Sequence, residues 1–119
     1  MKKTNKIVCP SDEDIENYHL LYGMFTALYN EMKQLSKNKQ EITLNDFKVK
    51  KINETLEKIK VLLSDQPTNV FLNLLDNETL PRYSDAILIL AQYRTALDRF
   101  GDKYCRKKSD DMINDLLRF

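Results

Sequence analysis

Residues 81–104, PRYSDAILILAQYRTALDRFGDKY, carry the pattern that decides the fold of this chain. Apolar side chains recur there about every three or four residues and form two adjacent rows. The first row is Tyr83, Ile87, Leu90, Leu97 and Tyr104, and the second is Ala86, Ile89, Tyr93, Ala96 and Phe100. At about 100° per residue the two rows cover roughly half of a helical cylinder, whereas a helix packed on one neighbour needs a stripe only a little over 100° wide. The stretch therefore predicts the central helix of a bundle, in contact with two or more neighbours.

Two residues interrupt these rows and leave alternatives open. Arg94 lies at the edge of the apolar arc, where an arginine usually lays its stem along apolar surface and keeps its charged head in water. A guanidinium directed at a ligand is the alternative interpretation of Arg94. Gly101 either softens the helix or marks the close approach of a neighbouring segment.

The whole chain is predicted to be all-α, a compact bundle of about four helices. It has 119 residues but only two glycines and three prolines, and its β-branched runs are short. Long helices are expected near residues 12–35, 45–63 and 81–107, and short ones near 68–76 and 109–118. Residues 1–10 are expected to form a flexible lead-in, and residues 11–119 a single helical-bundle domain.

Local signals predict where the helices begin. Ser11 precedes three acidic residues, which is typical of an N-cap followed by the positive end of a helix dipole. Thr43 or Asn45 can cap the second helix, and Pro81 or Ser84 can begin the last long one. The apolar arc expected to bury the first helix contains Ile15, Tyr18, Leu21, Tyr22, Met24, Phe25, Leu28, Tyr29, Met32 and Leu35.

Charge and cysteine content limit the class of protein. Nineteen basic and eighteen acidic residues create no field of one sign, which argues against a dedicated nucleic-acid binder. No stretch approaches the roughly 20 apolar residues of a membrane span, and the N-terminus has no secretory apolar region. Cys9 and Cys105, the two cysteines, are expected to stay reduced in a cytoplasmic protein, with a disulfide between them as the alternative.

Small and apolar side chains outside the expected core faces are candidate contacts for a partner protein. Gly23 lies mid-helix, where glycine costs about 1 kcal/mol relative to alanine, and Leu20 and Ala27 flank it. A tolerated glycine beside an incidental exposed leucine is the alternative. The complete candidate interface is Leu20, Gly23, Ala27, Leu88, Arg99, Leu116 and Phe119.

Basic residues define a second hypothesis, in which the protein binds nucleic acid through phosphate contacts. Glu54 and Glu57 lie among the lysines of the second helix, and this mixture favours a solvated face instead. The candidate phosphate contacts are Lys48, Lys51, Lys58, Arg106, Lys107 and Lys108.

No catalytic constellation is expected, and neither is a metal or a cofactor. His19 is the single histidine, and its pairing with Glu16 at i,i+3 lacks the second pair that a di-iron bundle requires. Two isolated glycines exclude a glycine-rich phosphate loop, and the cysteines lack metal-ligand spacing. We therefore expect a non-enzymatic protein-interaction module, such as an adaptor, inhibitor or regulatory subunit that binds a protein partner or itself. A tyrosine-lined pocket for a small molecule is a more distant possibility.

Overall fold

The computed structural model describes residues 10–39 and 41–105, and this part of the chain is all-α, which confirms the predicted class. It contains the α-helices α1 (Asp12–Ser36), α2 (Asp46–Leu62) and α3 (Tyr83–Phe100). A short 3-10 helix, η1 (Pro67–Phe71), follows α2, and one turn of π-helix, η2 (Gly101–Cys105), continues α3. Residues 1–9 of the expected lead-in 1–10, the short helix near 109–118 and residues 106–107 of the last long helix lie outside the described residues.

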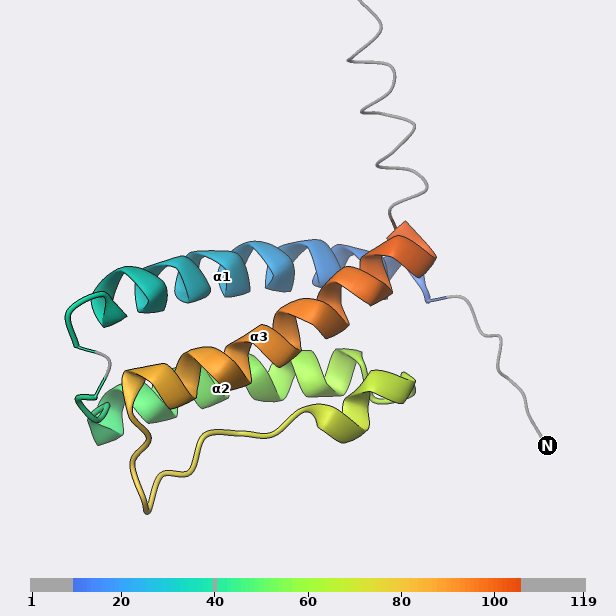
Figure 1. The fold of residues 1–119 in the computed structure, drawn as a ribbon. Coiled ribbons are helices and arrows are strands. Elements are labelled where there is room, and N and C mark those ends of the chain that lie inside the picture. Colours follow the sequence, from blue (N-terminus) through green and yellow to red (C-terminus); the bar gives the residue numbers. More distant parts are fainter. Residues whose placement is uncertain (1–9, 40, 106–119) are drawn as a thin grey trace, which may run out of the picture.

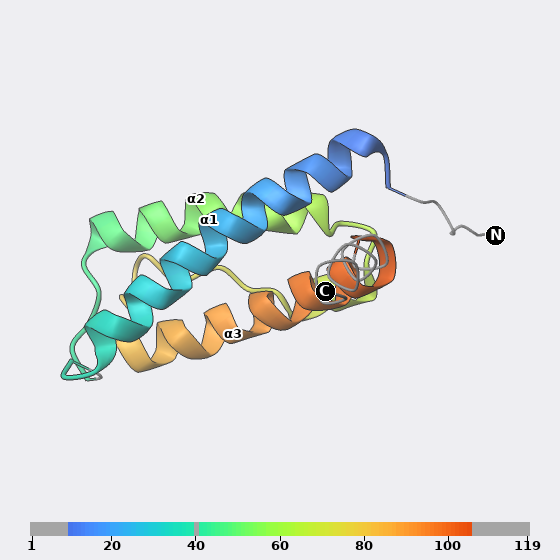
Figure 2. The same ribbon diagram turned by 90° about the horizontal axis from the view of Figure 1, so that it is seen from above.

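Helix α1 packs against both α2 and α3 and crosses obliquely over them (Figures 1 and 2). Its start is fixed by the predicted N-cap. The Asp14 backbone N–H donates to Ser11 Oγ over 3.1 Å, and the Ser11 N–H donates to Asp14 Oδ2 over 3.4 Å. Two of the orphan donors at the helix start are thereby satisfied.

The starts of α2 and α3 are joined across the chain. Asn45, the second of the two predicted caps, accepts from the Lys48 N–H over 2.8 Å. Neither Pro81 nor Ser84 caps α3: its N-cap is Arg82, whose N–H reaches Asp85 Oδ2 over 3.4 Å. An isolated antiparallel β-bridge between Thr43 and Arg82 joins the segment before α2 to the segment before α3. Local propensity does not predict this bridge, because the two residues are far apart in sequence.

The connection from α2 to α3 differs from the helix expected near residues 68–76. The helical part is the single 3-10 turn Pro67–Phe71, and residues 72–82 run on without a helix. Asn53 on α2 holds this segment, because its side chain donates to the Leu75 carbonyl and accepts from the Leu75 N–H, both over 2.9 Å. A side-chain amide therefore supplies the backbone partners that a helix would have supplied. Leu72 and Leu75 point into the core, while Val70 and Phe71 are exposed.

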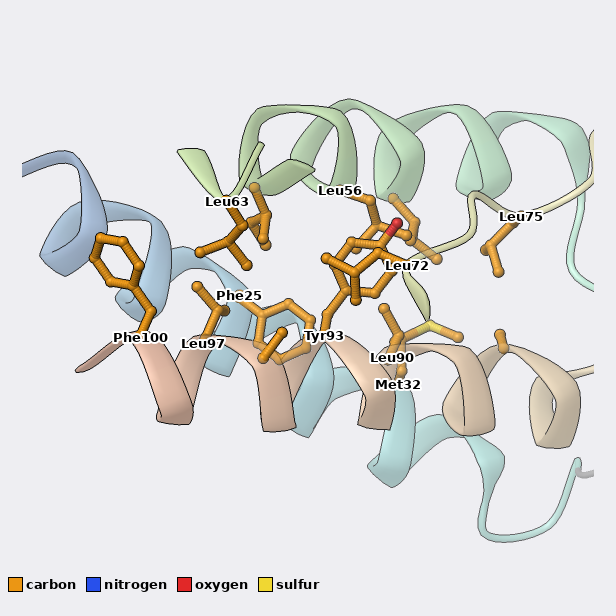
Figure 3. Packing of buried hydrophobic residues seen from close by; sticks show 14 of the residues in the cluster. Phe25, Met32, Leu56, Leu63, Leu72, Leu75, Leu90, Tyr93, Leu97 and Phe100 are labelled. Carbon is orange, nitrogen blue, oxygen red and sulfur yellow. The ribbon is translucent and has the colours of Figure 1, made fainter. Parts of the chain in front are cut away.

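A continuous apolar core fills the space between the helices and the 72–75 segment (Figure 3). Helix α3 contributes more buried residues than α1 or α2 does. It contacts both α1 and η1, as the two apolar rows predict. Tyr93 is fully buried and donates its hydroxyl to the Asn73 carbonyl over 2.8 Å. The largest fully buried side chains are Tyr93, Phe25, Leu44, Ile52, Leu56, Ile59, Leu63, Leu90, Leu97 and Val49.

The end of α3 lies against the start of α1, where Gly101 makes the close approach that was one of its two interpretations (Figure 1). A Cβ built on Gly101 would collide with the Tyr18 hydroxyl and lie 2.9 Å from Tyr18 Cζ. The Tyr18 ring packs in turn against Phe100, with ring centroids 5.3 Å apart. The absence of a side chain at Gly101 thus lets this aromatic contact close the bundle.

Candidate interaction cleft between α1 and α2

The first half of α1 and the last turns of α2 enclose an open cleft of about 560 Å³. Phe100 of α3 and residues 64–66 in the turn after α2 also line the cleft. Its apolar lining comes from Leu20 and Leu21 on α1 and from Val61 and Leu62 on α2. Charged side chains stand beside this lining, namely Asp14, Lys58 and Asp65.

Two of the lining side chains are strongly exposed: Leu20 shows 64% of its surface and Val61 shows 74%. Met24, one turn after Leu20, is also exposed at 58%, so its expected place in the core of α1 is wrong. Met24 is 40° from Leu20 on an ideal helix at about 100° per residue, which puts both on the same outward stripe. The cleft and this stripe together form an apolar surface on one side of α1, called here the Leu20 surface.

The structure places the predicted interface residues in more than one region. Gly23 and Ala27 are exposed on α1, and a Cβ at Gly23 would meet nothing within 4 Å, so this face of α1 is open. Leu88 is exposed on α3 at 65% but does not line the cleft. Arg99 lines a separate groove between α3 and η1, with Phe71 and Thr95. Leu116 and Phe119 lie outside the described residues.

Val61 is a strongly exposed cleft residue that the sequence did not identify as part of an interface. It stands among the charged residues of α2 and lies two positions after the core residue Ile59, which places it about 200° from Ile59 around the helix. An isolated valine on a polar helix face does not change the apolar period, so the period does not indicate that it belongs to a binding site. The signal that could have found it is spatial, because only the folded chain brings Val61 beside Leu20.

A polar cluster lies at the interface of α1 with α3. Tyr22 donates its hydroxyl to Asp98 Oδ1 over 2.8 Å, and Arg94 Nε lies 3.4 Å from Asp98 Oδ2. Burial raises the pKa of Tyr22 above its ordinary value, and the hydrogen bond to Asp98 adds to the shift. Arg94 therefore extends along the edge of the core and pairs with a carboxylate of its own helix, which is a packing role.

Two of the lysines proposed as phosphate contacts, Lys48 and Lys51, have protein partners within α2 and α3. Lys48 donates to the Tyr83 hydroxyl over 3.0 Å, and its ammonium lies 5.7 Å from the Tyr83 ring centroid. Lys51 pairs with Glu54 over 3.5 Å. Lys58 shares its surface with Glu54 and Glu57. Arg106, Lys107 and Lys108 lie outside the described residues.

Among residues 10–39 and 41–105, no group of three or more histidine, cysteine or acidic side chains is placed to hold a metal ion. His19 and Glu16 are both exposed on α1. Cys105 is a buried free thiol, and burial raises its pKa, which lowers its reactivity. None of the described helices is long and apolar enough to cross a membrane.

Comparison of the chain with protein-family models, curated proteins and solved structures finds no match.

Proposed function

We propose that this protein is a non-catalytic interaction module that binds a partner protein through the Leu20 surface. The observation that supports this function is the exposure of Leu20 and Val61 on facing sides of one open cleft. Single exposed apolar residues are ordinary on a protein surface, whereas apolar residues gathered at a concave site are typical of binding sites.

The lining of the cleft has the composition of a small interface. Its apolar side chains are accompanied by Asp14, Lys58 and Asp65, and apolar and charged groups occur together in protein interfaces. Burying the exposed parts of Leu20 and Val61 contributes about 1–2 kcal/mol each. A partner that inserts one or two apolar side chains between them gains affinity from the cleft, and the charged rim adds orientation.

The candidate roles are those of an adaptor, inhibitor or regulatory subunit, and self-association through the same surface belongs to this proposal. A cytoplasmic location belongs to it as well, on the argument of two thiols kept reduced.

The experiment compares three forms of the full chain: wild type, Leu20→Glu and Leu88→Glu. Leu88→Glu is the matched control for Leu20→Glu. The two leucines have similar exposed fractions, 64% for Leu20 and 65% for Leu88, but only Leu20 lines the cleft. Each form is used as bait in quantitative affinity purification, and its mass is recorded by light scattering. Circular dichroism confirms that the helical content of the three baits is equal.

We expect at least one protein, or a second copy of the chain, to be retained by wild type and by Leu88→Glu. Its recovery should fall tenfold or more with Leu20→Glu, because a carboxylate in the apolar cleft costs free energy on binding. Equal recovery of every captured protein by all three baits would refute the proposal. Loss with Leu88→Glu alone would move the site to α3.

A second measurement separates the nucleic-acid hypothesis. If the protein binds phosphate through its lysines, the purified chain should carry absorbance at 260 nm that is lost as salt is raised. The interaction module predicts a protein-like absorbance ratio at every salt concentration.

A further inference from the structure

We infer that the chain's own C-terminal segment, residues 109–119, docks in the cleft between α1 and α2. A regulatory role for this docking, in which the segment competes with a partner for the cleft, rests on the proposed function. The docking itself is a property of the isolated chain and is tested without any partner.

The first support is the place where the described chain stops. Phe100 lines the cleft, and η2 leads from it to Cys105, which is buried. The contact between Gly101 and the Tyr18 ring anchors η2 against α1, near the start of that helix (Figure 1). Residue 106 therefore follows a segment that is anchored beside the cleft.

The second support is length. Cys105 follows Phe100 by five residues, which is at most about 8 Å along a helix at 1.5 Å per residue. Seven further steps lead from Cys105 to Met112 and can span up to about 25 Å when extended. The chain can accordingly turn back and place residues after 109 in the cleft of the same molecule.

The third support is the pattern of the segment itself, SDDMINDLLRF. On an ideal helix its apolar residues fall within about 160° of the circumference, and its charged residues and asparagine fall on the other side. Such a helix has one face to bury and needs an apolar surface to receive it. The apolar residues are Met112, Ile113, Leu116, Leu117 and Phe119.

A different groove, which Pro67, Phe100 and Asp102 line, is a poorer receptor than the cleft. It is smaller than the cleft, at about 340 Å³, and none of the exposed large apolar side chains among the described residues lines it. The cleft offers Leu20 and Val61 instead, which are apolar and exposed. Intramolecular docking also starts from a high effective concentration, so a modest apolar contact is sufficient.

The experiment places the photoreactive residue benzoylphenylalanine at position 119 of the full chain, where it replaces Phe119. After irradiation, the products are separated by size and the crosslinked peptides are identified by mass spectrometry. We expect a crosslinked monomer in which residue 119 is joined to peptides containing Leu20–Leu21 or Val61–Leu62. A crosslinked dimer, crosslinks to the groove between α3 and η1, or no crosslink within the chain would each overturn the inference.

A variant pair in the segment makes the test specific. Ile113→Asp with Leu116→Asp removes apolar side chains and should lower the crosslink yield at least fivefold, whereas Asn114→Asp on the polar side should leave it unchanged. In methyl NMR spectra without the photoreactive residue, Leu116→Asp should shift the Leu20 and Val61 signals and leave Leu88 in place. Unchanged Leu20 and Val61 signals would contradict the docking.

The outcomes for docking and function can be told apart. If the segment shields the binding site, Ile113→Asp with Leu116→Asp should raise recovery of the captured partner severalfold. A crosslink to the cleft in a protein that retains no partner would support docking and refute the proposed function. Retention of a partner that depends on Leu20, in a protein that gives no crosslink to the cleft, would support the proposed function and refute docking.

Discussion

The two glycines of this chain should respond in opposite directions to the same substitution. Both glycines have a helical backbone conformation that alanine also adopts. Gly23 lies within α1, and Gly101 has φ −62° and ψ −43°. Their surroundings differ, since a Cβ on Gly23 meets nothing within 4 Å and a Cβ on Gly101 meets the ring and hydroxyl of Tyr18. Gly23→Ala and Gly101→Ala thus separate helix propensity from packing.

The magnitudes follow from these contacts. Gly23→Ala gains helix propensity alone, which raises the free energy of unfolding by about 0.5–1 kcal/mol. Gly101→Ala gains a similar propensity but must displace Tyr18, which is buried and wedged against Phe100 and Tyr22. Overpacking of this kind costs about 1–3 kcal/mol, so we expect a net loss of about 1–2 kcal/mol.

The assay is urea unfolding followed by circular dichroism at 222 nm, because the chain has no tryptophan to report on folding. Tyr18→Phe supplies a test of the mechanism, since it removes the atom that the new Cβ would meet first. Gly101→Ala should cost less in the Tyr18→Phe background, with a coupling of at least about 0.5 kcal/mol. A stabilising Gly101→Ala, or no coupling to position 18, would refute the close approach of η2 to α1.

Other predictions concern the core and the segment that follows η1. Asn53→Ala should lower the free energy of unfolding by about 2 kcal/mol in the same assay, because both backbone groups of Leu75 lose their partner; an effect below about 0.5 kcal/mol would show that water replaces the amide. Leu56→Ala should cost about 2–5 kcal/mol as a fully buried leucine, and a cost under 1 kcal/mol would be inconsistent with that burial. Burial, and to a lesser extent Glu57, raises the pKa of Tyr93 well above its ordinary value near 10, so the folded state keeps a proton that the unfolded state releases. Stability should therefore be intact below about pH 10 and fall above it by up to about 1.4 kcal/mol per pH unit from this group, and Tyr93→Phe should flatten that fall in urea titrations at pH 8–11.

Periodicity was sufficient to predict the three long helices, because each has enough turns for its apolar face to be distinguished from its polar face. It also predicted the wide burial of α3, which packs against α1 and η1 and reaches the Asn73 carbonyl through Tyr93. Ser11 and Asn45 were predictable as caps because capping depends on residues within one turn.

Features that depend on contacts distant in sequence were not predictable. Residues 68–76 are apolar enough for a helix, but the Asn53 amide on α2 binds both backbone groups of Leu75, which lies outside any helix. Met24 satisfies the helical period, yet α1 crosses over the other helices and leaves that position in solvent. Gly101 could be interpreted only once Tyr18, far away in sequence, was placed beside it.

The residues of the candidate site also differ in whether one helix alone is enough to identify them. Leu20, Gly23 and Ala27 could be identified from one helix, because an exposed stripe is a local pattern. Val61 could not, because its significance comes from lying across the cleft from Leu20. Leu88 and Arg99 satisfied the same local criterion as Leu20 but lie on α3, where they do not line the cleft.

The most direct test of the central claim is a dissociation constant measured by calorimetry between the purified full chain and the protein that it retains most strongly. The claim predicts that Leu20→Glu weakens this affinity by at least tenfold, which is about 1.4 kcal/mol, while Leu88→Glu changes it by less than twofold. Equal weakening by both substitutions, or an unchanged affinity with Leu20→Glu, would contradict the claim that this protein works through the cleft between α1 and α2.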